Sequence, residues 1–422
     1  MKGCKHIQAK VILGFFMLFI SIALMASVSQ AKEVVKIGVL LPFSGPLAYE
    51  GGEVFKGFEV ARVEQNEKGG LFGKQIEFVK GDAVDAKAAV SEAERLITVE
   101  GVKIIMGTFS SVRAFAATTV AERNKVIYWE TGAVADKITG RGYKYVFRNE
   151  APASKLARAA ARFGAVVAPE MLDIPINQFR VAVIGEDSSY GKSVSETVKT
   201  VVNEVGAKLV AYEFYDANIK DLSSLILRLK VKRPDALIPT CYVNDAILLH
   251  RQMKQLDLNV KVFVGTGVGH NTGKLRDAVG DDINGVICSG WPSTTINPAY
   301  AKGLPGFVSV YKKVWKGEIE SPHPFGNYSG AWLLWRVIER AGSTDPEAIR
   351  KAALAMDEPE GYQPIGWGVW FAGSDKPNAG QNIRPDWFVE QWQNGRLNTI
   401  WPPKAMAKGI KVMIPFPKWK ER

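Results

Sequence analysis

The chain has few of the residues that most often carry out chemistry on a substrate. Among its 422 residues there are only three cysteines and four histidines. It contains neither a G-x-S-x-G nucleophile motif nor the H-E-x-x-H pair of a zinc protease. His250, His270 and His323, the histidines beyond the N-terminal segment, are not at metal-ligand spacing. We therefore expect no enzyme, no metal site and no cofactor.

Two glycine-containing segments resemble nucleotide-binding loops, and neither has the required pattern. Gly185–Ser193 has one residue too many between its glycines, and Glu186 and Asp187 would repel a phosphate. Gly265–Gly269 lacks the G-x-G-x-x-G spacing. The net charge of +11 is spread along the chain without basic blocks, so nucleic acid is not an expected partner either.

Only one long apolar run is present, and it lies at the N-terminus. Lys2, Lys5 and Lys10 precede the run Val11–Val28, and small residues follow it up to Ala31. This order is typical of a secretory signal peptide, residues 1–31, with cleavage near Ala31. The run is 18 residues long, close to the lower limit for a membrane span, so an uncleaved anchor is the alternative. Cleavage would leave an exported, periplasmic protein of 391 residues with a net charge of +8.

The cysteines leave one question open. Cys4 precedes the apolar run and is not placed for lipid attachment, so Cys241 and Cys288 remain after cleavage. Each ends a strand-like run. An oxidising compartment permits a disulfide between them, and two buried free thiols fit the sequence equally well.

Short apolar runs alternate with helical patterns from Val34 onward, an order that predicts βαβ units and parallel sheets. After a first strand on the apolar run Val35–Leu40, which breaks at Pro42, and a helix from about Gly52, the expected strands are Gln75–Lys80, Lys103–Met106, Val126–Trp129, Lys144–Glu150, Arg180–Ile184, Lys208–Phe214, Ala236–Pro239, Val260–Val264 and Gly285–Cys288. The expected helices are Ala86–Val99, Val112–Arg123, Ser154–Val167, Lys192–Val205, Leu222–Val231, Asp245–Leu256, Leu275–Val279 and Ser329–Ala341.

The alternation starts a second time after a proline-containing connector at residues 169–175. Arg180–Ile184 then opens a series that is similar to the first. From Gln363 the texture changes to short segments rich in tryptophan and glycine, which predict a final hairpin that returns to one half. Two similar α/β halves leave a cleft between them.

Several predicted strand-to-helix loops carry hydroxyl, glycine or aromatic residues. These loops are Ser44–Pro46, Gly107–Ser111, Glu130–Gly132, Ser188–Gly191, Cys241–Tyr242 and Gly265–Gly269. Ligands of parallel sheets collect at the carboxyl ends of the strands, where such loops lie. Hydroxyls and loop N–H groups suit a carboxylate or an amide, and aromatic rings cover apolar surface.

With these segments the chain resembles a known family, the periplasmic type I solute-binding proteins of ABC importers, in the branch of the leucine/isoleucine/valine-binding proteins. The resemblance covers essentially all of the chain after the signal segment. It rests on six motifs in the family's order: KIGVLLPFSGP, NEKGGLFGKQIEFVKGD, IIMGTFSS, RGYKYVFR, VAVIGEDSSYGKS and PDALIPTCY.

The resemblance implies an α/β fold of two Rossmann-like lobes with parallel sheets, joined by three crossover segments. The crossovers are expected near Arg148–Ala151, Gly290–Pro292 and Gly361–Trp367. The first lobe would comprise residues 32–149 and 292–362, and the second residues 150–291 and 363–422. The family also implies a monomer that traps a small molecule between closing lobes and delivers it to a membrane ABC permease.

The family's ligand-binding residues match this sequence unevenly. The serine that meets a ligand carboxylate corresponds to Ser111, with Ser110 beside it, and a small residue that contacts the ligand corresponds to Gly132. The two tyrosines that close over the ligand correspond to Tyr190 and Tyr242. A threonine of the family is replaced by Val134, so that contact is lost or replaced.

The main departure is the missing acid that pairs with an amino-acid ammonium. Its loop is Gly265–Val268 here, with Thr266 and Gly267 at the centre and no carboxylate. Glu130, beside Thr131, is one substitute, and Asp187 is a weaker one. Otherwise the ligand lacks an ammonium and is a small carboxylate, an amide or an aromatic acid, whose body would suit Phe109, Trp129 and Trp291.

Three hypotheses follow. The first is a non-enzymatic carrier for an importer. The second is a periplasmic sensor of the same fold that signals to a membrane receptor. The third is an exported enzyme that uses Glu130 as an acid or base.

Overall fold

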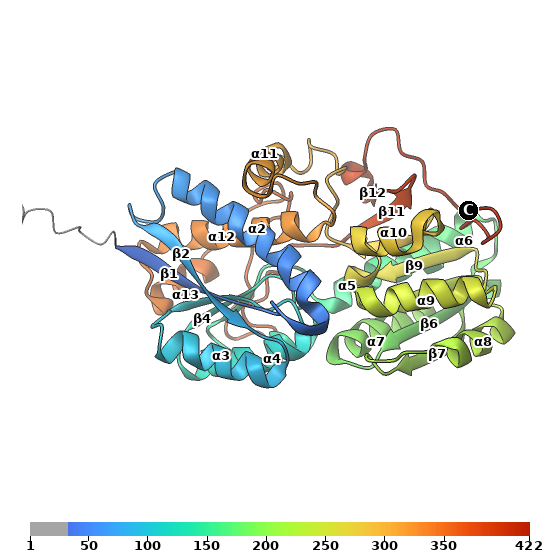
Figure 1. Ribbon diagram of the computed structural model, residues 1–422, viewed down its shortest axis with the longest axis horizontal. Helices are drawn as coiled ribbons and strands as arrows, with labels where there is room; N and C mark the ends of the chain where they lie inside the picture. The colour runs from blue at the N-terminus through green and yellow to red at the C-terminus, as the bar shows by residue number, and fades with distance from the viewer. Residues whose placement is uncertain (1–32) are drawn as a thin grey trace, which may run out of the picture. The chain divides into compact units, whose positions relative to one another are not determined.

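The computed structural model describes residues 33–422, and these fold around two separate sheets (Figure 1). The predicted signal peptide lies outside the described residues. Within residues 33–422, no helix is both long and apolar enough to cross a membrane.

The first sheet has the strand order β2-β1-β3-β4-β5. Its strands are β1 (Val34–Leu41), β2 (Gln75–Asp82), β3 (Ile104–Gly107), β4 (Ile127–Glu130) and β5 (Val146–Arg148). The β1–β3, β3–β4 and β4–β5 pairs are parallel, so the carboxyl ends of these strands meet at one edge.

Helices cover both faces of the first sheet (Figure 1). They are α2 (Ala48–Glu67), α3 (Ala86–Thr98), α4 (Ser111–Arg123), α11 (Leu304–Trp315), α12 (His323–Ala341) and α13 (Pro346–Leu354). Strand residues alternate between the two faces. Ile105 packs in the cluster that contains residues of α3 and α4, whereas Ile104 and Met106 pack in the cluster that contains residues of α2 and α12.

The second sheet has the strand order β12-β11-β10-β9-β8-β6-β7. Its strands are β6 (Arg180–Glu186), β7 (Lys208–Tyr215), β8 (Ala236–Thr240), β9 (Val262–Thr266), β10 (Ile287–Gly290), β11 (Phe388–Gln393) and β12 (Arg396–Trp401). The β10–β11 and β11–β12 pairs are antiparallel, and the pairs from β10 to β7 are parallel. The hairpin predicted after residue 363 is thus confirmed as β11–β12.

The helices that accompany the second sheet include the one predicted at 154–167. They are α5 (Ala153–Arg162), which continues through the wide turn η3 (Phe163–Val167) into α6 (Ala168–Met171), then α7 (Ser189–Glu204), α8 (Ser223–Lys232), α9 (Val243–Gln255) and α10 (Gly273–Val279).

The chain passes between the sheets three times: after β5, after β10 and before β11. The third passage differs from the expected position near Gly361–Trp367. The Phe371 ring lies 5.4 Å from the rings of both Trp129 and Phe147, in the first sheet. The Arg148 N–H also donates to the Gly380 carbonyl. This segment has only isolated bridges and no periodic pattern, so its sequence did not reveal which sheet it joins.

The predicted strands and helices are present, with shifts of a few residues at their ends. Two helices, α11 and α13, were missed. The first turn of α11 contains Pro305 and Gly306, which read as a loop, and α13 has few large apolar residues. Cys241 and Cys288 are both free and buried, so the structure holds no disulfide between them.

Candidate functional site

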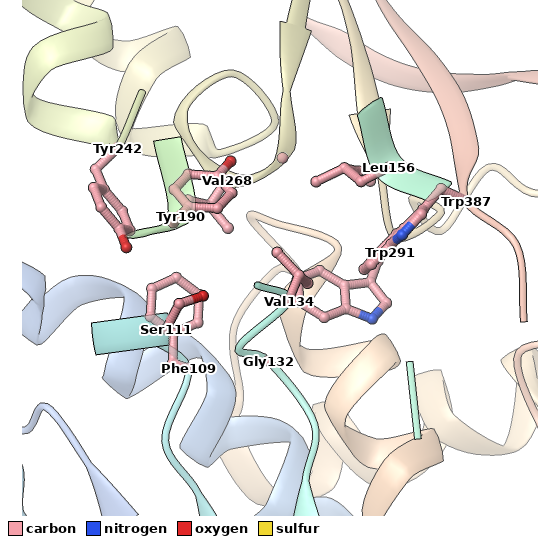
Figure 2. Close-up of a pocket in the computed structure, with 12 residues that line it drawn as sticks. Phe109, Ser111, Gly132, Val134, Leu156, Tyr190, Tyr242, Val268, Trp291 and Trp387 are labelled. Carbon is pink, nitrogen blue, oxygen red and sulfur yellow. The ribbon is translucent and has the colours of Figure 1, made fainter. Parts of the chain in front are cut away.

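A cavity lies where the loops of both sheets meet (Figure 2). Its lining residues are Phe109, Ser111, Gly132, Val134, Leu156, Tyr190, Tyr242, Gly267, Val268, Gly290, Trp291 and Trp387. The space open to the centres of water molecules is about 20 Å³, which is room for roughly one water. The cavity as it stands is too small for an organic ligand.

Glu130 organises the two loops that the first sheet contributes. Its Oε2 accepts from the Thr108 N–H at 2.6 Å, and its Oε1 accepts from the Gly132 and Ala133 N–H groups at 2.9 and 2.8 Å. The N–H groups of Phe109 and Thr131 donate to Oε1 at 3.4 and 3.1 Å. Burial raises the pKa of Glu130 to about 7, and these N–H donors counteract the rise. The carboxylate thus joins the loops after β3 and β4.

The hydrogen bonds of Glu130 also position Phe109 at the cavity. Phe109 has a φ of 70°, in the left-handed region that a bulky residue seldom adopts. Its N–H and that of Thr108 are held by the same carboxylate. A Cβ at Gly132 would lie 2.8 Å from the Phe109 Cα, so the neighbouring loop can approach only because this residue is glycine.

The first turn of α4 leaves its backbone donors open. Ser110 is the N-cap residue and makes no side-chain cap. No residue in the described range accepts a hydrogen bond from the backbone N–H groups of Ser111, Val112 or Arg113. Ser111 lines the cavity, and its Oγ accepts from the Ala135 N–H at 3.1 Å, so its own hydrogen is free to donate. A helix N-terminus with open N–H groups is a site for an anion.

At the second sheet, the N-terminus of α7 differs from that of α4 because its backbone N–H groups already have acceptors. The Glu186 carboxylate, at the end of β6, accepts from the N–H groups of Ser188 and Gly191 at 2.7 and 2.8 Å. The Ser188 Oγ accepts from the Tyr190 N–H. The protein's own carboxylate therefore occupies the first turn of α7.

Tyr190 is fixed by a contact with the β9 loop. Its hydroxyl donates to the Thr266 carbonyl at 2.7 Å. Gly267 follows with a φ of +66°, and a Cβ there would lie 2.5 Å from the tyrosine oxygen. The loop therefore needs glycine at this position.

Five aromatic residues line the cavity (Figure 2). The rings of Tyr190 and Tyr242 are 5.3 Å apart, and Phe109 lies 6.4 Å from Tyr242. At the other end, Trp291 and Trp387 meet at 5.1 Å in an edge-to-face arrangement. Such rings suit the faces and edges of a flat apolar ligand.

No charged side chain lines the cavity within residues 33–422. Burial raises the pKa values of Tyr190 and Tyr242, so both stay neutral phenols. The polar groups that remain are these hydroxyls, Ser111, the indole N–H groups of Trp291 and Trp387, and backbone atoms. The cavity thus offers hydrogen bonds and helix N–H groups, and no counter-charge for a cation.

The structure brings together five of the nine predicted site residues at the cavity: Ser111, Gly132, Tyr190, Tyr242 and Gly267. The other four, Ser110, Glu130, Thr131 and Thr266, do not line it. Ser110 accepts from the Arg113 guanidinium, Thr131 donates to Asn327, and Thr266 donates to Thr240. Both oxygens of Glu130 face loop N–H groups, an arrangement that does not favour the expected contact with a ligand ammonium.

Of the aromatic residues expected near the cleft, Phe109 and Trp291 line the cavity. Trp129 does not, because it stacks on Phe147 in the core and donates to the Gly330 carbonyl. Sequence reasoning missed Leu156 and Trp387. Leu156 belongs to the apolar face of α5, and Trp387 arrives through the irregular third passage, so neither carried a local signal.

Comparison with known proteins identifies the architecture. The sequence profile of the periplasmic binding proteins matches residues 34–396. The chain belongs to the periplasmic binding protein family. A Leu/Ile/Val-binding protein homologue of Brucella suis is 38% identical over 391 residues, covering 92% of this chain and 97% of that protein.

Solved structures of other periplasmic binding proteins show the same fold. A leucine-binding protein of Thermotoga maritima has a TM-score of 0.74 at 25% identity, and the match covers 87% of this chain and 98% of that one. An R. palustris solute-binding protein in complex with 4-hydroxybenzoate also has a TM-score of 0.74, at 20% identity, covering 92% and 99%. The predicted type I periplasmic binding fold is confirmed.

Proposed function

We propose that this periplasmic binding protein carries a small carboxylate with a flat or apolar body and without an ammonium group. The observation that carries the proposal is a combination: a cavity wall without any carboxylate, next to the open N-terminus of α4. A ligand with a negative end and an apolar end matches both features.

The carboxylate would bind at the first turn of α4. The backbone N–H groups of Ser111, Val112 and Arg113 are open there, and the Ser111 hydroxyl can donate beside them. The positive end of the helix dipole favours an anion at this place. Ser111 thereby keeps the role that the family resemblance implies.

An amino-acid ligand would bring an ammonium into the same cavity. A buried ammonium needs a charge partner, because its loss of hydration is not compensated otherwise. The β9 loop offers Gly267 and Val268, and Glu130 is already bonded to loop N–H groups. The ligand chemistry therefore favours a carboxylate such as the 4-hydroxybenzoate of the R. palustris protein over an amino acid such as leucine.

The body of the ligand would lie among Phe109, Tyr190, Tyr242, Trp291 and Trp387. With about 20 Å³ of space, the present cavity is too small for such a body. We propose that the two lobes separate to admit it and close again over it, as a ligand-shifted equilibrium.

Contacts between the lobes would hold the closed arrangement. The Ser193 Oγ donates to Asp136 at 3.1 Å, and the Gly273 N–H donates to the Glu320 carbonyl at 2.6 Å. Arg276 pairs with the Glu320 carboxylate, also at 2.6 Å. We propose lobe boundaries near residues 149 and 291, and a third between Asn382 and Phe388, because Phe371 and Gly380 contact the first sheet.

The protein would act as a monomeric carrier, and a membrane permease would bind its closed form and receive the ligand from it.

A thermal-shift screen of residues 32–422 against benzoates, aliphatic carboxylates, amides and amino acids tests the ligand class. At about 100 times its dissociation constant a ligand adds roughly 2.7 kcal/mol to the free energy of unfolding. Stabilisation by carboxylates without an amino group is expected, together with compaction in small-angle scattering. Stabilisation by amino acids alone would overturn the proposal.

A further inference from the structure

His323 is a buried polar residue beside the cavity that neither the motifs nor the family resemblance assigned to the site. It is the first residue of α12 and has no exposed surface. Its ring lies 5.9 Å from that of Phe109 and 5.2 Å from that of Trp291. Both of these rings line the cavity. His323 therefore forms the layer directly behind two cavity walls.

The neighbours of His323 determine which ring nitrogen carries the proton. The Glu53 carboxylate pairs with the Lys56 ammonium at 2.5 Å. The Ser321 hydroxyl donates to the other oxygen of Glu53 at 2.6 Å. Because its hydrogen is used there, the Ser321 oxygen is an acceptor for the His323 Nδ1, which lies at 3.2 Å. Nδ1 therefore carries the hydrogen, and Nε2 holds a lone pair.

That lone pair has no partner within residues 33–422. The His323 Nε2 is fully buried and accepts no hydrogen bond there. Buried polar atoms without partners are rare in folded proteins, and each one asks for an explanation. Burial also lowers the pKa of His323 to about 3, so the imidazole stays neutral and Nε2 stays an acceptor at ordinary pH.

We infer that, once the lobes separate and Phe109 and Trp291 move apart, His323 Nε2 accepts a hydrogen bond from a hydroxyl group on the body of the bound carboxylate, so that the protein selects hydroxy-substituted ligands. The inference rests on the proposed function, since it needs a carboxylate in this cavity. A site that binds a ligand hydroxyl discriminates against an analogue without one, because the buried acceptor is then left unpaired. His323 would thus set specificity within the ligand class, while the α4 N-terminus sets the class.

The test is isothermal titration of the protein with benzoate, 3- and 4-hydroxybenzoate, and the corresponding methoxybenzoates. The methoxy compounds keep the oxygen and remove the donor. We expect the wild type to bind one hydroxybenzoate about three- to tenfold more tightly than both benzoate and its methoxy analogue, as one net hydrogen bond provides. His323→Phe should remove this preference and leave benzoate binding intact.

Two further variants separate recognition from packing. Ser321→Ala should lower the preference without removing it, because the imidazole is then free to adopt its other tautomer. His250→Phe is the matched control: His250 is also buried with unpartnered ring nitrogens, but it lies against Phe263 and His270, which do not line the cavity. The His250→Phe variant should keep the wild-type preference for the hydroxybenzoate.

Three outcomes have distinct meanings. A preference for the hydroxy compound that persists in His323→Phe, or is absent from the wild type while benzoate binds, overturns the inference and leaves the proposed function standing. Failure of every benzoate to bind the wild type overturns the inference, and it overturns the proposed function only if the aliphatic carboxylates fail to bind as well. Should His323→Phe not fold, the imidazole ¹⁵N spectrum of the wild type decides: the Nε2 resonance must move with the hydroxybenzoate and not with benzoate.

Discussion

The loops of the two sheets use a buried glutamate in opposite ways. Glu130 ends β4 and Glu186 ends β6, and both carboxylates turn inward to accept backbone N–H groups. Glu130 holds loop residues 108–109 and 131–133, which precede or lie beside α4. Glu186 holds Ser188 and Gly191 and so occupies the first turn of α7.

The difference between the N-termini of α4 and α7 indicates where an anion can bind. On the second sheet the protein supplies its own anion to the helix N-terminus, and on the first sheet it leaves that position open. The same residue type at the end of a strand thus closes one anion site and shapes another. The two lobes are similar in topology and unlike in charge recognition.

Filling the open N-terminus should have the largest effect. Ser111→Asp places a carboxylate at the first residue of α4, where Glu186 already serves α7. The aspartate would repel the ligand carboxylate and would accept hydrogen bonds from the N–H groups of the first turn of α4. We therefore expect the affinity for carboxylates to fall at least about a hundredfold, or roughly 2.7 kcal/mol. Isothermal titration measures the loss.

The matched control is Ser189→Asp, at the first residue of α7. Ser189 is exposed and its helix is already occupied by Glu186, so carboxylate affinity should stay close to that of the wild type. Equal losses in the two variants would show that the two helix ends are equivalent, against the comparison above.

Truncating the aromatic wall should have a middle-sized effect. Tyr242→Ala removes a ring that contacts both Tyr190 and Phe109, and we expect a loss of about 1–3 kcal/mol in binding through lost burial. Tyr190→Phe should cost less than Tyr242→Ala, because the Tyr190 hydroxyl is already donated to Thr266. Unchanged affinity in Tyr242→Ala would place the ligand elsewhere.

The last prediction concerns the free energy of unfolding and its pH dependence, and not ligand binding. Burial raises the pKa of Glu130 from 4.5 to about 7, so between these values the folded protein binds a proton that the unfolded chain has released. This contribution is fully present below pH 4.5 and is lost as pH rises toward 7, by roughly 1.4 kcal/mol per pH unit. In denaturant titrations, Glu130→Gln should be less stable than the wild type and should lack this slope. A parallel pair of pH profiles would contradict the assignment.

The sequence predicted the two-lobed fold because buried parallel strands and amphipathic helices have strong local periods. The strand-end loops and the family resemblance together pointed to Ser111, Tyr190 and Tyr242, which line the cavity. The sequence did not predict where Glu130 points, because a carboxylate at a strand end can face either a ligand or its own loop. The sequence did not predict Trp387 or His323 for another reason: only the folding of distant segments brings them beside the cavity loops.

The most direct test of the account compares leucine with 4-methylpentanoate, which is leucine without its amino group. Isothermal titration of the wild type with both ligands isolates the contribution of the ammonium. Since no carboxylate among residues 33–422 lines the cavity, we expect 4-methylpentanoate to bind and leucine to bind far more weakly or not at all. Tighter binding of leucine would contradict the account, because it would require an acid that reaches the ligand when the lobes close.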